Sequence, residues 1–292
     1  MKIIVLGFSS LEHDLVEKFD LKNLKQKEYG KIQIPLNGLM VDPSPVLVWT
    51  SFITGKKPGE FGFDNTVVYN RSIKPLISFY YSIRKKKLYE NVLQRDEDKK
   101  TTDYLSKKLL KYHLAVKPSK KNINCATLFD LPNMIHENLP VLDSYPEYNN
   151  EAKKSMLSEE DKQKCEHKWK EEFEKQKKEV FSALSNDWSL YMNHFYILDG
   201  IQHIYYDNEL KIRTYYLYVD SFIQDVLKSI GDYVLLLIVS DCGKKNGLYT
   251  NHGFYSINKK MNLNNIKMID FKDLIENNIK TDIKNIFEGG VL

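Results

Sequence analysis

Short patterns in the second half of the chain carry side chains that could bind a cation. Asp199 and His203 are spaced i, i+4, so on a helical turn they share one face. Asp241 ends a long apolar run in Ser-Asp-Cys-Gly, and His252 follows it in Thr-Asn-His-Gly. A carboxylate together with imidazoles suits Zn²⁺ or a similar divalent ion. Each pattern is common by itself, and it is their order along the chain that predicts one metal site.

Strands must position these side chains. Residues 2–7, KIIVLG, form a β-branched run that ends in glycine, and residues 11–19 follow with apolar positions at helical spacing. Strand, glycine turn and helix are the opening of a doubly wound α/β fold. Residues 232–243, DYVLLLIVSDCG, predict a central buried strand that ends in polar residues, and residues 195–200, FYILDG, predict another.

The remaining elements complete an α/β pattern around a charged middle. We expect a strand or edge hairpin at 31–36, and at 46–55 a buried element that Gly55 closes like a helix C-cap. Further predictions are a helix at 220–231, a strand in GFYSIN and a late helix in FKDLIENNI. Residues 150–180 predict an exposed amphipathic helix whose apolar side is formed by Trp169, Phe173 and Val180.

These elements predict one domain over residues 1–292, with a mostly parallel central sheet, helices on both faces and a Lys/Glu-rich helical insertion over approximately 80–190. Ligands in such sheets bind beyond the carboxyl ends of the strands. We therefore expect Ser9, Asp199 and Asp241, each of which follows a predicted strand, to lie at the same edge.

Composition indicates an ordinary globular chain. Hydrophobic residues make up 42% of the 292 residues and charged residues 28%, which argues against disorder. The net charge of +4 is too mild to indicate nucleic acid by itself, although RKKK at 84–87 could contact phosphates. Three cysteines give no disulfide framework, and no apolar run is long enough to span a bilayer. We expect a cytoplasmic protein that does not enter the membrane, and the sequence leaves its oligomeric state open.

Several segments occur in an order that is similar to that of a known family. They are LGFSS at 6–10, WTSFITGKKPGEFG at 49–62, LDGIQH at 198–203, VSDCG at 239–243 and TNHGFYS at 250–256. In this order they resemble the type I phosphodiesterase/nucleotide pyrophosphatase branch of the alkaline phosphatase superfamily. The resemblance covers both ends of the expected core and leaves out the middle.

The resemblance implies an alkaline phosphatase-like fold and a phosphoryl-transfer centre with two metal ions about 4 Å apart. Asp199, His203 and His252 match the ligands of the first ion, and Asp241 matches a ligand of the second site or a bridging ligand. The expected cofactor is a divalent ion, with Zn²⁺ favoured and one ion favoured over two.

Departures from the family pattern fall mainly on the second ion and the nucleophile. The family's opening aspartate is Ser9, and the histidine partner of Asp241 is Cys242. The nucleophile position falls on Pro45, which has no hydroxyl, so the adjacent Ser44 is the candidate nucleophile. The histidine expected after the Pro-Gly turn is Phe61.

The resemblance therefore implies a divergent metal-dependent hydrolase acting on a phosphate ester or nucleotide, with the first metal site intact and the second degraded. The alternative is a catalytically degenerate member that binds a nucleotide or a partner protein. A sulfatase is disfavoured, because Ser44-Pro45-Val46 does not match a sulfatase nucleophile segment. Nucleic-acid binding through the Lys-rich middle is a further alternative.

Overall fold

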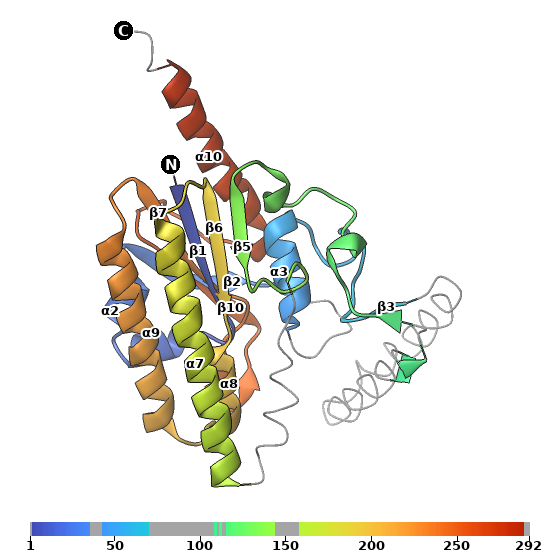
Figure 1. The fold of residues 1–292 in the computed structure, drawn as a ribbon, viewed down its shortest axis with the longest axis vertical. Coiled ribbons are helices and arrows are strands. Elements are labelled where there is room, and N and C mark those ends of the chain that lie inside the picture. The colour runs from blue at the N-terminus through green and yellow to red at the C-terminus, as the bar shows by residue number, and fades with distance from the viewer. Residues whose placement is uncertain are drawn as a thin grey trace.

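The computed structural model describes residues 2–35, 43–69, 108–109, 111–112, 115–143 and 158–288, with side chains up to residue 280 (Figure 1). The strands are β1 (Lys2–Phe8), β2 (Glu28–Gln33), β3 (Val68–Tyr69), β4 (Ala115–Val116), β5 (Met134–Glu137), β6 (Leu190–Phe195), β7 (Val234–Ser240), β8 (Lys244–Lys245), β9 (Leu248–Tyr249) and β10 (His252–Ile257). The α-helices are α1 (His13–Lys18), α2 (Lys22–Lys25), α3 (Pro45–Thr54), α7 (Glu159–Leu184), α8 (Ile197–Ile204), α9 (Glu209–Ser229) and α10 (Phe271–Glu288). Short 3₁₀ turns are η2 (Lys120–Asn122), η3 (Leu128–Asp130) and η4 (Met268–Asp270).

The central sheet has the strand order β2-β10-β7-β1-β6-β5. Strands β7, β1, β6 and β5 are parallel, whereas β10 is antiparallel to both of its neighbours. This confirms the predicted mostly parallel sheet. Strand β5 and helix α7 both come from the range expected to be an insertion, and they pair with and pack on this sheet.

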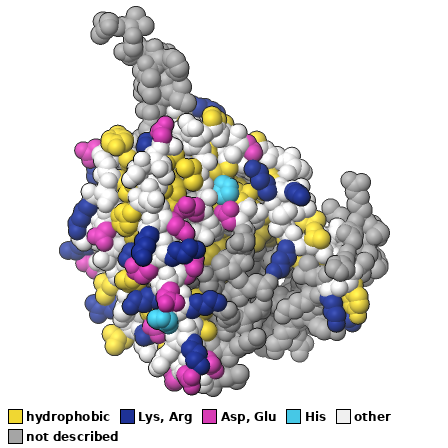
Figure 2. All heavy atoms as spheres, in the orientation of Figure 1, with side chains coloured by type: hydrophobic (Ala, Val, Ile, Leu, Met, Phe, Trp, Pro, Cys, Tyr) yellow, Lys and Arg dark blue, Asp and Glu magenta, His cyan; other side chains and the backbone are white. Residues whose placement is uncertain are grey.

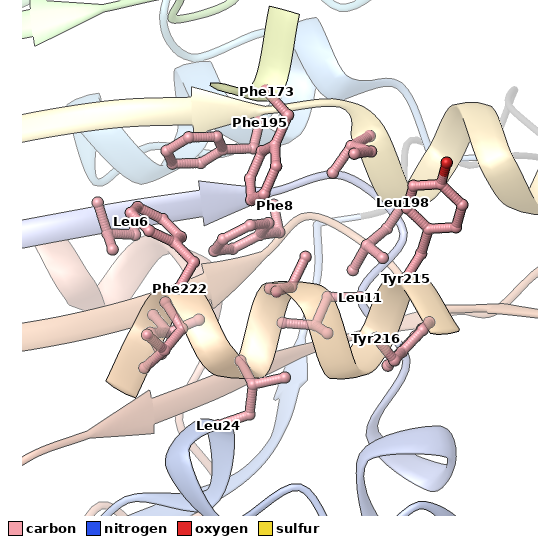
Figure 3. Close-up of a cluster of buried hydrophobic side chains, with 14 of the residues drawn as sticks. Leu6, Phe8, Leu11, Leu24, Phe173, Phe195, Leu198, Tyr215, Tyr216 and Phe222 are labelled. Atoms are coloured by element: carbon pink, nitrogen blue, oxygen red, sulfur yellow. The ribbon is translucent and has the colours of Figure 1, made fainter. Parts of the chain in front are cut away.

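Side chains alternate between two cores because successive residues of a strand face opposite sides of the sheet. In β1, Ile4, Leu6 and Phe8 face the helices α7, α8 and α9, whereas Ile3 and Val5 face α3 and α10. Strand β7 alternates in the same way, which explains why its sequence is continuously apolar. Figure 3 shows the first core, where Phe195 stacks on Phe8 with ring centroids 4.8 Å apart.

Helix α3 confirms the prediction for the segment before Gly55. Ser44 is the N-cap residue and Pro45 takes the first helical position, where its missing N–H costs no hydrogen bond. Gly55 ends the helix at a left-handed φ of +66° and donates its N–H to Ser51.

Helix α7 confirms the predicted amphipathic helix from residue 159 onward, with Trp169, Phe173 and Val180 buried, and it extends to Leu184. Residues 150–157 of that prediction lie outside the described residues. On its outer face Lys and Glu side chains are interspersed without a patch of one sign (Figure 2). The hydroxyls of Tyr205 and Tyr215 both donate to Glu166 of this helix, at 2.7 Å and 2.6 Å. These tyrosines therefore connect α8 and α9 to α7.

Some predicted boundaries are wrong. The strand predicted at 195–200 is wrong beyond its first residue, because β6 ends at Phe195 and α8 begins two residues later. Helix α8 buries Ile197, Leu198 and Ile201. The helix predicted at 220–231 begins at Glu209 and ends at Ser229. The strand predicted at 31–36 starts earlier, at Glu28, and ends at Gln33. The RKKK run at 84–87 lies outside the described residues.

Within the described ranges, no helix combines the length and the apolar character needed to cross a membrane.

Candidate functional site

The predicted site residues lie at the carboxyl edge of the parallel strands. Ser9 follows β1 and Asp241 follows β7, while Asp199 lies in the first turn of α8, which follows β6. Ser10 connects the two carboxylates, because its hydroxyl donates to Asp199 Oδ1 at 2.7 Å and its backbone N–H to Asp241 Oδ1 at 3.4 Å. Ser10 has a left-handed φ of 62°, a conformation that costs about 1 kcal/mol or more outside glycine. The turn after β1 therefore positions Ser10 to donate hydrogen bonds to both carboxylates.

Asp199 has a partner for each of its oxygens. Oδ1 accepts from Ser10, from the Tyr249 hydroxyl at 3.1 Å, and from the Lys244 ammonium at 3.5 Å. Oδ2 lies 3.5 Å from His203 Nε2. Burial alone would raise the pKa of Asp199, but the charges of Lys244 and His203 outweigh it and hold this pKa well below its usual range. Asp199 is therefore an ionised carboxylate, and the structure brings it together with His203.

Lys244 is a site residue that the sequence analysis missed. It begins β8 directly after the Ser-Asp-Cys-Gly segment, and its side chain is 1% exposed, compared with 55% for Lys245. The ammonium lies 4.5 Å from the centroid of the Tyr249 ring as well as near Asp199. Adjacent residues of a strand face opposite sides, so Lys244 points into the site and Lys245 points into solvent.

His252 lies beside a second missed residue, Glu12. Its Nε2 is 3.2 Å from Glu12 Oε1, and the Glu12 side chain is fully buried. Thr250 donates to Glu12 Oε2 at 3.1 Å. Burial opposes ionisation of Glu12, but the hydrogen bonds from His252 and from the Asp14 backbone outweigh it and lower the pKa of Glu12. The partner of His252 is thus an ionised glutamate.

Asp241 is the centre of a buried hydrogen-bonded cluster. Ser9 donates to Oδ2 at 3.1 Å and the Trp49 indole to the same oxygen at 3.2 Å, while the Cys242 thiol donates to Oδ1 at 3.4 Å. Burial and the nearby charge of Asp199 raise the pKa of Asp241 to about 7. Burial and the charge of Asp241 raise the pKa of the Cys242 thiol as well, so Cys242 is a neutral thiol here.

His194 is a third residue without a recognisable sequence signal. It is fully buried, with Nε2 3.3 Å from the Ser9 hydroxyl and with the rings of Trp49 and Tyr196 4.8 Å and 4.3 Å away. Burial lowers its pKa to about 3, so the imidazole is neutral. Gly7 makes this packing feasible, because a Cβ there would lie 2.7 Å from the Trp49 ring.

The predicted nucleophile region lies at the start of α3. Ser44 is almost fully buried, and its side chain makes no capping hydrogen bond. Pro45 is the first residue of the helix, so the position that matches the family nucleophile has no hydroxyl. Phe61 is fully buried and packs on Phe63, with ring centroids 4.8 Å apart.

A metal ion requires donors that converge with free lone pairs. In the described part of the chain, no group of three or more His, Cys, Asp or Glu side chains is placed to hold an ion. Tyr249 gives its one hydroxyl proton to Asp199, so its oxygen accepts from His203 Nε2, at 2.9 Å. His252 Nε2 must likewise carry a proton to bond with the ionised Glu12. As placed, these residues do not fit a bound ion.

A pocket of about 260 Å³ adjoins this site. Lys244 and Lys245 line it together with Tyr206, whose side chain is partly exposed, and acidic groups such as Asp14 contribute as well. Lys245 pairs with Asp14 at 3.5 Å. The pocket therefore offers cations, carboxylates and an aromatic ring to a polar ligand.

Comparison with known proteins identifies a family. The sequence pattern described as "Type I phosphodiesterase / nucleotide pyrophosphatase" matches residues 4–286. This match confirms the resemblance to the alkaline phosphatase superfamily, and with it the expected fold class. No curated protein is similar enough to count as a relative.

Solved structures with some likeness are distant. Murine ectonucleotide pyrophosphatase / phosphodiesterase 5 is 11% identical, with a TM-score of 0.45 over 83% of this chain and 57% of that one. The chain thus spans little more than half the length of that neighbour. The PH0037 protein from Pyrococcus horikoshii is 11% identical, with a TM-score of 0.46 over 96% of this chain and 97% of that one.

Proposed function

Because this chain belongs to the type I phosphodiesterase / nucleotide pyrophosphatase family, we propose that it binds a nucleotide or another phosphate ester at the carboxyl edge of its sheet and has lost two-ion hydrolysis. It has the family and fold class of a nucleotide pyrophosphatase/phosphodiesterase-like hydrolase.

The observation that carries the proposal is the neutral cluster around Asp241. A second ion needs anionic ligands, because charged oxygens offset the loss of the ion's hydration. Here Ser9 and Cys242 are neutral donors that point their protons at Asp241, at 3.1 Å and 3.4 Å. Hydrogen bonds from Ser9, Trp49 and Cys242 already satisfy the carboxylate of Asp241.

The nucleophile region also supports the loss of two-ion hydrolysis. In-line attack needs a hydroxyl that can be activated. Pro45 cannot supply one, and Ser44 lies one residue away as the N-cap of α3. The phenyl ring of Phe61 is buried in the apolar core, so it offers no polar group where the family pattern has histidine.

Ligand binding is proposed at the pocket lined by Lys244, Lys245 and Tyr206. The exposed ammonium of Lys245 suits phosphate oxygens, and a tyrosine ring suits a base, whereas the buried ammonium of Lys244 lies against Asp199. The acidic groups in the same lining suit the hydroxyl and amino donors of a nucleoside.

A second candidate function is a one-ion hydrolase, as the sequence predicts. The contact of Asp199 with His203, at 3.5 Å, favours it. In that case Asp199, His203 and His252 would hold one Zn²⁺, and Ser44 would attack the phosphorus. Such binding would require His252 to leave Glu12.

Turnover separates these two functions. We expect the purified chain to hydrolyse bis-p-nitrophenyl phosphate no faster than its Asp199→Ala variant with Zn²⁺, Mn²⁺ or Mg²⁺. A rate clearly above that of the variant with any of these ions would show metal-dependent hydrolysis through Asp199 and refute the loss of catalysis.

Calorimetry with AMP tests the binding role. We expect AMP to bind, and we expect Lys245→Glu to weaken binding because it reverses a charge that lines the pocket. The matched control is Lys228→Glu, an equally drastic change at an exposed residue near the end of α9. Absence of AMP binding, or equal weakening by both variants, would contradict binding at this pocket.

A further inference from the structure

The first ion position contains a cation that belongs to the protein. The side chain of Lys244 is 1% exposed, and lysine is almost never buried to this extent unless it is paired. Its ammonium lies 3.5 Å from the Asp199 carboxylate and 4.5 Å from the centroid of the Tyr249 ring. A carboxylate and an aromatic face both stabilise an ammonium away from water.

We propose that the Lys244 ammonium takes the place of a divalent ion at Asp199, so that the first ion position of this chain is closed to metal. This inference concerns a different position from the Asp241 cluster and does not depend on the proposed nucleotide binding. The proposed function assigns a loss of metal binding to the second ion position, at Asp241. A buried Lys244 would cause the same loss at the first ion position, at Asp199.

Charge balance is the first reason. The buried Lys244 ammonium lies 3.5 Å from Asp199 Oδ1, so a positive charge from the protein itself already lies beside this carboxyl group. A divalent ion bonded to Asp199 Oδ1 would lie about 2 Å from that oxygen. It would therefore lie within roughly 5.5 Å of the ammonium, and like charges at such a distance repel strongly.

The second reason is that both carboxylate oxygens of Asp199 already have partners in the protein. Asp199 already accepts from Ser10, Tyr249 and Lys244, and His203 lies against its other oxygen. An ion would have to displace several of these contacts at once. An ammonium differs in that it needs only acceptors and offers no vacant coordination position for a substrate oxygen.

Tyr249 fixes the arrangement. Its hydroxyl donates to Asp199 at 3.1 Å and lies 2.9 Å from His203 Nε2, while its ring faces Lys244. One side chain thus contacts the acid, the imidazole and the ammonium. This explains how Lys244, which lies on a two-residue strand, is held in a defined place.

Calorimetric titration of the EDTA-treated full-length protein with Zn²⁺, and separately with Mn²⁺, tests the inference. Wild type should bind no ion at Asp199, so the Asp199→Asn variant should titrate in the same way as wild type. Lys244→Met should gain Asp199-dependent binding of one ion, tighter by roughly 100-fold or more. Lys245→Met, a change at the exposed neighbouring lysine, should behave like wild type.

Two results would overturn the inference. One is an ion bound to wild type that Asp199→Asn removes, which can be measured whether or not the Lys244 variants fold. The other is a folded Lys244→Met or Lys244→Gln protein, checked by circular dichroism and gel filtration, that gains no binding. Neither result bears on whether AMP binds, so the nucleotide proposal fails or stands separately.

Discussion

Replacing Asp199 by asparagine should destabilise the protein, and the sign of this change distinguishes two views of the site. In an acidic metal site without its ion, neighbouring carboxylates repel, so removing one raises the free energy of unfolding. In the site described here the carboxylate neutralises the buried ammonium of Lys244. Asp199→Asn would remove a negative charge 3.5 Å from that buried ammonium, and the protein should unfold more easily.

The structure sets the size of this effect. Unit charges 3.5 Å apart attract by about 5 kcal/mol at an effective dielectric constant of about 20. The amide oxygen of asparagine can still accept from Ser10 and Tyr249, which retains part of the hydrogen bonding. We therefore expect a loss of about 3 kcal/mol, at the lower end of what breaking a buried ion pair costs.

Urea unfolding in the presence of EDTA measures the loss. Asp225→Asn is the matched control, because Asp225 is half exposed and lies 4.0 Å from Lys228, so its change should stay within about 0.5 kcal/mol. The double variant Asp199→Asn, Lys244→Met removes both charges and should recover most of the loss. A more stable Asp199→Asn protein would refute the reasoning.

Two further predictions concern residues around the site. Buried His194 has a pKa of about 3, whereas a histidine in the unfolded chain has a pKa of about 6.5. The stability that the neutral imidazole contributes is therefore complete above about pH 6.5 and is lost as the pH falls. Between pH 7.5 and 5.5 wild type should lose about 1.4 kcal/mol more than His194→Gln in urea titrations, and equal losses would show that His194 titrates normally. Gly200→Ala would place a Cβ 2.7 Å from the buried ring of Trp169, and should lower the free energy of unfolding by about 2 kcal/mol; an unchanged value would mean that α7 and α8 separate freely.

Much of the fold follows from local patterns in the sequence. Strand β7 was predictable because a parallel strand buried on both faces is apolar throughout, and α3 because Gly55 provides a C-cap. The strand predicted at 195–200 failed because Ile197 and Leu198 continue an apolar run that does not distinguish a strand from a buried helix.

The site was less predictable, because its partners come from distant parts of the chain. Nothing local marks Lys244 as buried or Glu12 as the partner of His252, since both contacts arise only when the strand ends meet. The order of motifs did locate Asp199, His203 and Asp241 at one edge. Their role as metal ligands, together with His252, stays a prediction that the ion titrations decide.

The most direct measurement is the anomalous scattering of a crystal of the full-length chain soaked in Zn²⁺ and measured at the zinc absorption edge. We predict no anomalous peak within bonding distance of Asp199, and electron density for the Lys244 side chain beside that carboxylate. A peak coordinated by Asp199, His203 and His252, with Lys244 displaced, would contradict the account.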